Sequence, residues 1–254
     1  MGSALTLTPL LGLPLFSPGD DLAAVTIAST RDQGFVPAAG DVLVVAQKVV
    51  SKVENRQVAL ASVVPGERAR SVAEQTGKDP RLVELILSES ASVLRTRPGL
   101  LVVEHRRGHI LANAGIDTSN IDRQSDSVLL WPEDPDASAA ALAAAVGEAF
   151  GVAIPVIISD SIGRAWRLGT VGHAIGVSGM DPLWNQVGAS DLFDNRLRVT
   201  EPATADAIAA AAGLVQGEAA EAQPVVWVRG CALGPGPDRT SRALLRPQSA
   251  DMFR

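Results

Sequence analysis

The first half of the chain alternates between continuous apolar runs and regularly spaced apolar residues. The run DVLVVAQKVVSKVE, from Asp41, predicts a buried strand that ends in lysines. Residues 66–95 have helical spacing that breaks at GKDP, where a helix stop meets a proline. In LLVVEHRRGHILANAG, two β-rich runs flank RRG and predict a hairpin.

The second half combines alanine-rich helices with short apolar strands. One helix is predicted from about Ser138 to Gly151 and another over residues 203–222, and they precede the strands IPVIISD and PVVWVRG. Because strands and helices mix without a steady βαβ rhythm, we predict an α+β fold with mixed or antiparallel sheets and packed helices. No repeat or long linker marks a boundary, so we expect a single domain over residues 1–254, with a two-lobed form left open.

Composition narrows the class of protein. Hydrophobic residues make up 46% of the 254 residues but aromatic ones only 4%, which predicts a core of Val, Leu, Ile and Ala. A formal charge of -6 argues against a broad nucleic-acid surface. The single cysteine cannot form an internal disulfide, and the apolar N-terminus lacks a basic segment and contains prolines. We therefore expect a cytoplasmic protein without a membrane segment.

Several common catalytic motifs are absent from the sequence: GxxxxGK[ST], GxGxxG after a strand, GxSxG and HExxH. His105 and His109 have a spacing that would suit a metal on a helix. Since they bracket the RRG turn, we interpret them instead as flanking the arms of an exposed hairpin. With only three histidines in the chain, a zinc enzyme is disfavoured.

Polar groups follow the strand IPVIISD in the stretch ISDSIGRAWR. Asp160 and Ser161 offer hard oxygen donors, which Mg²⁺ or Mn²⁺ accepts, at the predicted end of a strand. Arg164 and Arg167 are suited to phosphate or carboxylate oxygens. These residues together suggest a metal-phosphate site. The stretch alone is equally consistent with a structural role, in which Asp160 caps the next element and the arginines form surface ion pairs.

Three other segments contain polar groups suited to the same site. Asp117 and Asn120, in ANAGIDTSNID, could ligate a metal and contact a base or ribose, but an Asx turn also explains them. Lys48 and Lys52 could reach phosphates from the end of a strand, or simply extend into water. Glu218 lies near a predicted helix end, where a solvated acid is the default.

Together, six segments resemble one family in the same order along nearly the whole chain: GLPLF, AQKVVSK, ANAGIDTSN, ISDSIGRAWRLGTVGHAIGVSG, DLFDNRLRVTEPATADAIAAAAGLVQGE and ALLRPQSADMFR. The family is that of the GTP-dependent coenzyme F420-0:L-glutamate ligases. The resemblance implies an intertwined homodimer of the F420 gamma-glutamyl ligase type with its active site in a groove, in the stand-alone form without a C-terminal reductase domain.

The resemblance also implies the ligands. The substrates would be GTP, coenzyme F420-0 and L-glutamate, which is added once or as γ-linked units. The cofactors would be two Mg²⁺ or Mn²⁺ ions per site, and a need for K⁺ is left open.

Site residues follow from the same resemblance. The first metal site falls on Asp117 and Asp160, and the second on Ser161 and Glu218. We expect catalytic roles for Asp117, Asp160, Arg164 and Lys52. The nucleotide-binding positions are Leu13, Pro14, Leu15, Phe16, Gln47, Lys48, Lys52, Asn120, Gln216 and Gly217.

Two residues stand where relatives commonly have glycine. Asn55 tolerates a left-handed backbone, so its turn should be kept, whereas Asp194 leaves the geometry of its loop open.

A carboxylate and an amine do not form an amide at neutral pH without activation. We therefore expect the acceptor carboxylate to attack the γ-phosphate of GTP and the glutamate amine to displace phosphate from the resulting acyl phosphate. Two alternatives remain at this point: a nucleotide-dependent amino-acid ligase that acts on a different carboxylate acceptor, and a non-catalytic nucleotide-binding dimer.

Overall fold

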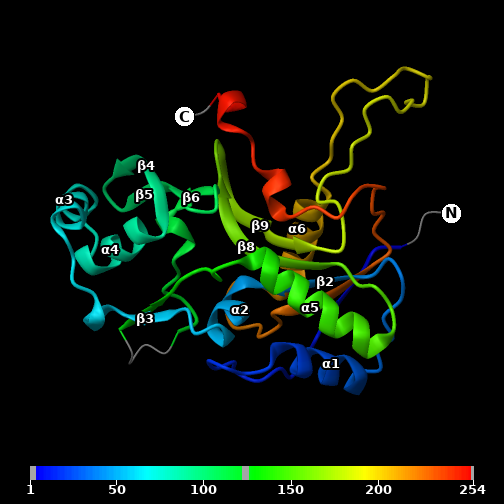
Figure 1. The fold of residues 1–254 in the computed structure, drawn as a ribbon, viewed down its shortest axis with the longest axis horizontal. Helices are drawn as coiled ribbons and strands as arrows, with labels where there is room; N and C mark the ends of the chain where they lie inside the picture. The colour runs from blue at the N-terminus through cyan, green and yellow to red at the C-terminus, as the bar shows by residue number, and fades with distance from the viewer. Residues whose placement is uncertain (1–3, 122–125, 253–254) are drawn as a thin grey trace.

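A mixed five-stranded sheet forms the centre of the computed structural model, which describes residues 4–121 and 126–252 (Figure 1). The strand order is β1 (Thr6–Pro9), β10 (Val225–Arg229), β2 (Val42–Ala46), β8 (Val156–Arg164) and β9 (Arg167–Ser178). Strands β2 and β8 are parallel, and all other neighbours are antiparallel. The predicted α+β class with mixed and antiparallel sheets is thus confirmed.

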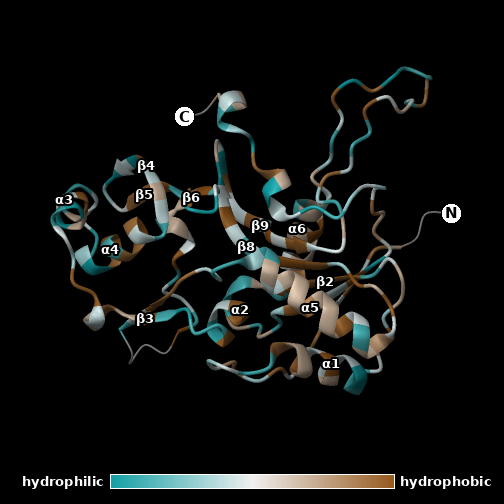
Figure 2. Cartoon of the chain, in the orientation of Figure 1, coloured by the Kyte–Doolittle hydropathy of each residue, from teal (hydrophilic) through white to brown (hydrophobic). Residues whose placement is uncertain are grey.

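Helices cover both faces of this sheet because its central strands are apolar on both sides. The helices α1 (Leu22–Asp32), α2 (Gln47–Val53) and α5 (Pro135–Phe150) pack on the face that includes Leu43 and Val45. Helix α6 (Thr204–Gln216) packs on the opposite face, which includes Val42 and Val44. The hydropathy colouring shows brown residues along β2, whereas the helices mix brown, pale and teal residues (Figure 2).

Two glycines in β9 let the helices approach the sheet closely. A Cβ atom at Gly172 would lie 2.5 Å from the carbonyl oxygen of Ala209 in α6. A Cβ atom at Gly176 would lie 2.3 Å from the carbonyl oxygen of Pro135 in α5. Any side chain at these positions would push a helix away from the sheet.

A smaller lobe, comprising the elements from β3 to β7, has its own apolar cluster. Strand β3 (Gln57–Ala59) pairs with β7 (Ser127–Leu129), and β4 (Ser90–Arg97), β5 (Leu100–His105) and β6 (Ile110–Ala112) form a second sheet. Helices α3 (Glu67–Thr76) and α4 (Pro80–Ser88) pack against it. The predicted hairpin LLVVEHRRGHILANAG is confirmed as β5 and β6.

Two of the predicted element types are corrected. The helical pattern of residues 66–95 breaks at GKDP as predicted, but its last part is β4, because Ser90–Arg97 pairs with β5. The predicted strand from Asp41 ends at Ala46, and the QKVVSKV segment forms α2. Short apolar runs do not distinguish the two states, and here the turn into a helix is made without any intervening loop.

The alanine-rich helices are confirmed with modest changes at their ends. Helix α5 begins at Pro135, three residues before the predicted start, and ends before Gly151 as predicted. Helix α6 ends at Gln216, six residues earlier than predicted, because Gly217 adopts a non-helical backbone. No helix in the described part of the chain combines the length and apolar character that crossing a bilayer requires.

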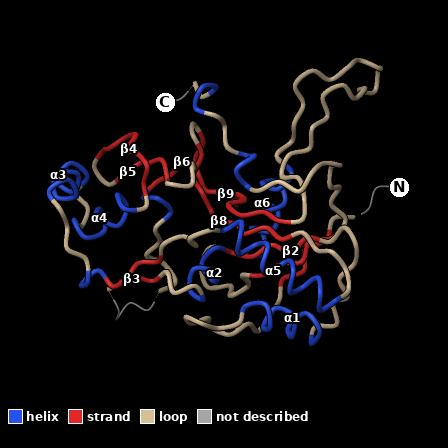
Figure 3. The backbone as a smooth tube through the Cα atoms, in the orientation of Figure 1, coloured by secondary structure: helices blue, strands red, loops and turns tan. Residues whose placement is uncertain are grey.

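A long arm between β9 and α6 projects from the body of the protein (yellow in Figure 1) and has no regular helix or strand (Figure 3). Asp191 orders its tip by accepting hydrogen bonds from the backbone N–H groups of Phe193 (2.8 Å) and Asn195 (2.9 Å). Asp194 has φ 62°, so it adopts the left-handed conformation that glycine usually provides, as does Asn55 with φ 57°. The left-handed turn expected at Asn55 is therefore confirmed. The loop geometry left open at Asp194 is also a left-handed turn.

Candidate active site

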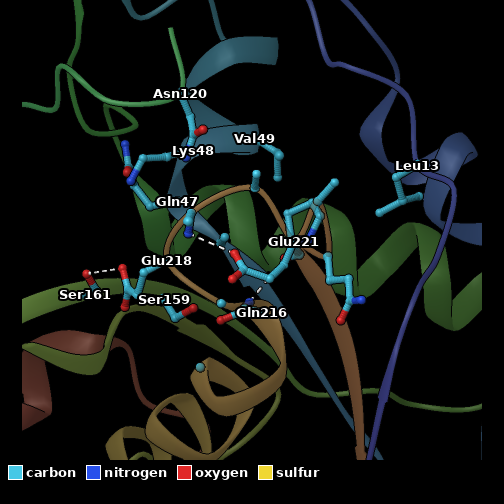
Figure 4. A pocket seen from close by; sticks show the side chains of 18 of the residues that line it. Leu13, Gln47, Lys48, Val49, Asn120, Ser159, Ser161, Gln216, Glu218 and Glu221 are labelled. Carbon is cyan, nitrogen blue, oxygen red and sulfur yellow. Dashed lines mark hydrogen bonds between the residues drawn. The ribbon is translucent and has the colours of Figure 1, made fainter.

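A pocket of about 380 Å³ opens where the parallel strands β2 and β8 separate (Figure 4). Its walls come from segments that are far apart in the sequence: the loop after β1, the start of α2, the segment after the short 3₁₀ helix η2 (Asn113–Gly115), the middle of β8, and the end of α6 with the loop that follows. The lining includes thirteen of the predicted site residues, namely Leu13, Pro14, Leu15, Phe16, Gln47, Lys48, Lys52, Asn120, Asp160, Ser161, Gln216, Gly217 and Glu218. Asp117 reaches this group through its ion pair with Lys48.

Lys48 and Lys52 enter the pocket from α2, not from the end of a strand as predicted. They are one helical turn apart and therefore share one face of the helix. Burial lowers the pKa of Lys52, and the positive charge of Lys48 adds to this effect. Two ammonium groups on one face of a short helix produce a positive wall that suits phosphate oxygens.

Asp117 forms both an Asx-type turn and an ion pair. Its carboxylate accepts a hydrogen bond from the N–H of Ser119 (2.6 Å) and contacts the ammonium of Lys48. Burial raises the pKa of this carboxyl, but the hydrogen bonds from Lys48 and Ser119 outweigh burial and leave the pKa below its ordinary value. Asp117 is therefore ionised at neutral pH and lies against a cation.

Asp160 lies in the middle of β8, not at its end. Strand β2 stops at Ala46, opposite Ser159, so β8 continues without its parallel neighbour from Asp160 onward. The Asp160 carboxylate accepts hydrogen bonds from the indole N–H of Trp131 (2.8 Å) and from the N–H of Ser161 (2.9 Å). Burial raises its pKa to about 6, although the Trp131 hydrogen bond and the charge of Lys48 act in the opposite direction.

Ser161 and Glu218 face each other across the pocket. The Ser161 hydroxyl donates to the Glu218 carboxylate at 3.0 Å, as the dashed line in Figure 4 shows. The backbone at Gly217 has φ 70° and ψ 177°, a region that is essentially restricted to glycine, and it turns the chain out of α6 so that Glu218 reaches β8. Glu218 is therefore a pocket residue, although it is also an exposed acid next to a helix end, as the default interpretation has it.

Two glutamines supply neutral polar groups in the pocket. The buried Gln47 donates from Nε2 to the Ser51 hydroxyl at 2.7 Å, and its Oε1 has no hydrogen-bond partner among the described residues. Gln216 donates to the carbonyl oxygen of Pro224 at 3.2 Å. A buried amide oxygen without a protein partner is an acceptor available to a ligand.

Arg164 and Arg167, the two arginines predicted to suit phosphate or carboxylate oxygens, do not line the pocket. The position of Arg164 shows the reason. Arg164 ends β8, four residues beyond Asp160, which is about 13 Å along an extended strand. Its guanidinium donates to the carbonyl oxygen of Leu168 at 3.4 Å in the hairpin between β8 and β9. On a helix, Asp160 and Arg164 would lie one turn apart on the same face, but on the extended strand β8 they are separated.

His105 and His109 flank the turn of the β5–β6 hairpin as predicted, but the expectation that they are exposed is wrong. His105 is 1% exposed, and both imidazole rings pack against Trp131, at centroid distances of 5.0 and 5.2 Å. Sequence analysis also missed Trp131 itself. Its only signal was its rarity, because the chain has four tryptophans and no tyrosine.

The oxygen donors of the pocket suit a hard divalent cation. Over residues 4–121 and 126–252, no three His, Cys, Asp or Glu side chains converge on one point. Instead the donors form two pairs: Ser161 is bonded to Glu218, and Asp160 lies close enough to Asp117 for the negative charge of one carboxylate to raise the pKa of the other. The Lys48 ammonium interacts with both carboxylates of the second pair, which shows that this space accommodates positive charge.

Comparison with known proteins gives consistent matches along the chain. Residues 11–230 match the family model described as F420-0:Gamma-glutamyl ligase. The chain is similar to proteins named coenzyme F420:L-glutamate ligase from three archaea. It is 43% identical to that of Methanothermobacter thermautotrophicus, with 96% of each chain covered. It is 43% identical to that of Methanopyrus kandleri, with 93% of this chain and 92% of the relative covered. For Archaeoglobus fulgidus the identity is 40%, with coverage of 97% and 95%.

Proposed function

The chain belongs to the F420-0:gamma-glutamyl ligase family, and on this premise we propose that it uses GTP and divalent metal to join L-glutamate to the side-chain carboxylate of coenzyme F420-0. The observation that carries the proposal is the convergence of two lysines, two carboxylates and the Ser161–Glu218 pair on one pocket. A triphosphate needs fixed cations and metal ligands together, and the pocket supplies both.

The nucleotide lies, in this proposal, between the α2 face and the apolar wall formed by residues 13–16. Lys48 and Lys52 contact phosphate oxygens as point charges, which requires Lys48 to leave Asp117 when a metal ion arrives. The free oxygen of Gln47 accepts a hydrogen bond from the ribose or the base. Asn120 and the carboxamide of Gln216 provide further polar contacts at the rim.

Asp117 and Asp160 would hold one divalent ion, and Ser161 and Glu218 a second, both through oxygen. When bound, such ions offset the negative charge that develops on the transferred phosphoryl group. The chain's own contribution is to fix these donors. Asp160 is on a rigid strand, Asp117 is held by its backbone bonds with Leu129, and Glu218 is held by the turn at Gly217.

The proposed reaction has two steps, phosphorylation of the acceptor carboxylate and displacement of the phosphate by the amine. An oxygen of the acceptor carboxylate attacks the γ-phosphorus, the bond to the β-phosphate oxygen breaks, and GDP leaves. The amine nitrogen of L-glutamate then attacks the acyl carbon, inorganic phosphate leaves, and the nitrogen releases a proton to water. Because the acceptor is its own nucleophile, the protein acts by positioning and electrostatics, and no covalent enzyme intermediate is needed.

We also propose that the protein works as a homodimer in the cytoplasm. The projecting arm exposes Leu192 (98% exposed), Phe193 (85%) and Val199 (87%) on a segment whose tip is ordered by Asp191. Apolar side chains on an ordered projection are typical of a surface that is covered in an assembly. A second copy would cover them by exchanging arms with the first.

The test is product analysis by mass spectrometry after incubation with F420-0, L-glutamate, GTP and Mn²⁺. The proposal requires GDP, phosphate and an acceptor heavier by glutamate residues. Asp160→Ala should abolish this product, while Asp32→Ala, at an exposed position on α1, should not change it. Turnover of GTP only with another carboxylate acceptor would replace the proposed substrate, and nucleotide binding without any turnover would refute the proposed activity.

A further inference from the structure

Trp131 connects the smaller lobe to Asp160, a proposed metal ligand on β8 of the central sheet. It follows β7, is fully buried, and donates its indole N–H to the Asp160 carboxylate at 2.8 Å. The other carboxylate oxygen of Asp160 accepts from the backbone N–H of Ser161 at 2.9 Å. Each oxygen thus receives one directed hydrogen bond, which fixes the plane of the carboxylate.

The backbone of Trp131 is held by Arg56, which in turn is held by Glu89 and its partners. Arg56 donates from Nε to the Trp131 carbonyl oxygen at 2.8 Å and from Nη2 to Glu89 at 3.1 Å. Glu89 also pairs with Arg106 at 3.0 Å and lies 3.5 Å from Nε2 of His105. His105 Nδ1 accepts from the N–H of Arg107, so the neutral imidazole carries its proton on Nε2, toward Glu89.

The indole ring is held as tightly as the backbone. The His105 and His109 rings pack on it from the β5–β6 hairpin, tilted by 46° and 85°. On another side, a Cβ atom at Gly115 would lie 2.3 Å from the indole nitrogen, so only glycine permits this approach. The ring therefore cannot rotate or shift without disturbing the smaller lobe.

Trp131 differs from an ordinary buried tryptophan in the group that accepts its hydrogen bond. Trp227, the other fully buried tryptophan, also donates one hydrogen bond, to the Thr30 hydroxyl at 3.0 Å, and stacks on Phe35. Its bond joins two core elements and does not reach the pocket. The Trp131 bond instead ends on a carboxylate that lines the pocket, and hydrogen-bond donors of this kind orient metal ligands.

We propose that Trp131 is a positioning residue that fixes the Asp160 carboxylate in the orientation needed to bind a divalent cation, with the smaller lobe as its support. This inference rests on the proposed function, since it presumes that Asp160 is a metal ligand. The smaller lobe, which also supplies Asp117 and Asn120, would thus support a metal ligand that lies on β8 of the central sheet.

The experiment compares Mn²⁺ binding by the parent protein, Trp131→Phe, Trp227→Phe and Asp160→Asn, with Mn²⁺ alone as the probe and the free ion followed by electron paramagnetic resonance. Loss of an outer hydrogen bond to a metal ligand typically weakens binding about 10- to 100-fold. We expect the Kd for Mn²⁺ to rise at least tenfold in Trp131→Phe and to stay within about twofold of the parent in Trp227→Phe. Thermal unfolding of both variants controls for the loss of a buried indole.

The outcomes separate the inference from the proposed function. If Asp160→Asn binds Mn²⁺ as tightly as the parent, the proposed metal site is wrong. If Asp160→Asn weakens binding and Trp131→Phe does not, the site stands and the positioning role of Trp131 is overturned. Should Trp131→Phe fail to fold, a benzothienylalanine residue at 131 keeps the ring shape and replaces the N–H by sulfur. Parent-like Mn²⁺ binding by that protein would also overturn the inference, and weakened binding would support it.

Discussion

Replacing Asp160 by asparagine should make the metal-free protein more stable at neutral pH while it removes activity. The carboxyl of Asp160 has a pKa of about 6 in the folded protein, chiefly because of burial, against 3.8 as the ordinary value. The folded state therefore binds this proton more tightly than the unfolded chain does. Above pH 6 the folded protein must hold an ionised, poorly solvated carboxylate, which is a cost of folding.

The magnitude follows from the difference between the two pKa values. Each pH unit is worth about 1.4 kcal/mol, so the ionised carboxylate costs the fold about 3 kcal/mol at pH 7 or above. Asparagine removes this cost and its Oδ1 keeps the bond from Trp131. In the parent, the N–H of Ser161 donates to the second oxygen of the Asp160 carboxylate. In the variant this N–H would face the NH₂ group of the asparagine, which cannot accept a hydrogen bond, at a cost of about 1 kcal/mol. The net gain is about 2 kcal/mol, or about 4–8 °C in Tm for a chain of this size.

The assay is chemical denaturation of both proteins in a metal chelator between pH 4 and pH 8. The advantage of Asp160→Asn should be largest at pH 7–8 and should shrink as the pH falls through 6, because the parent carboxyl then takes up its proton. Near pH 4 the variant should be slightly less stable than the parent. If the parent and Asp160→Asn are equally stable at pH 7.5, or if the difference between them does not change with pH, the argument that Asp160 is a desolvated acid is refuted.

Three further changes test other parts of the structure. Burial, aided by the charges of neighbouring basic residues, lowers the pKa of His109 to about 4, so its contribution to stability should fall by up to about 3 kcal/mol as the pH falls from about 7 to 4. Denaturation across that range should therefore show the parent losing about this much relative to His109→Phe, a comparison in which the opposite effect of Asp160 cancels. Gly217→Ala would place a methyl group 2.2 Å from the Glu221 carboxyl carbon in a glycine-only backbone region, and we expect at least tenfold weaker GTP binding by calorimetry. Gly163→Ala, where a Cβ atom meets nothing within 4 Å and the residue does not line the pocket, should bind GTP normally. Phe193→Asp puts a charge on the exposed arm and should shift the protein from dimer to monomer in light scattering, without changing the fold of the monomer. A parent protein that is already monomeric would refute the proposed dimer.

Local patterns in the sequence were sufficient for much of the fold. The apolar run of β2, the break at GKDP and the alanine-rich segments of α5 and α6 each specify an element without help from distant residues, because apolar periodicity and helix-terminating residues act over one or two turns. Segments with no such signal were misassigned. Residues 90–97 form a strand only because β5 is beside them, and QKVVSKV forms a helix although three of its residues are valine, a strand former.

The residue types of the active site were equally visible in the sequence. Carboxylates, a hydroxyl and lysines indicate a metal and a phosphate by their chemistry alone, and the family resemblance indicated which of them to choose. Their distances were not visible, since side chains separated by up to 170 positions meet only through the sheet. Tertiary structure alone decided that Arg164 is carried away along β8, that Glu218 is turned back by Gly217, and that the indole of Trp131 reaches Asp160. Chemistry is a property of each residue, whereas proximity is a property of the packed chain, and this is why the sequence determined the first and left the second to the fold.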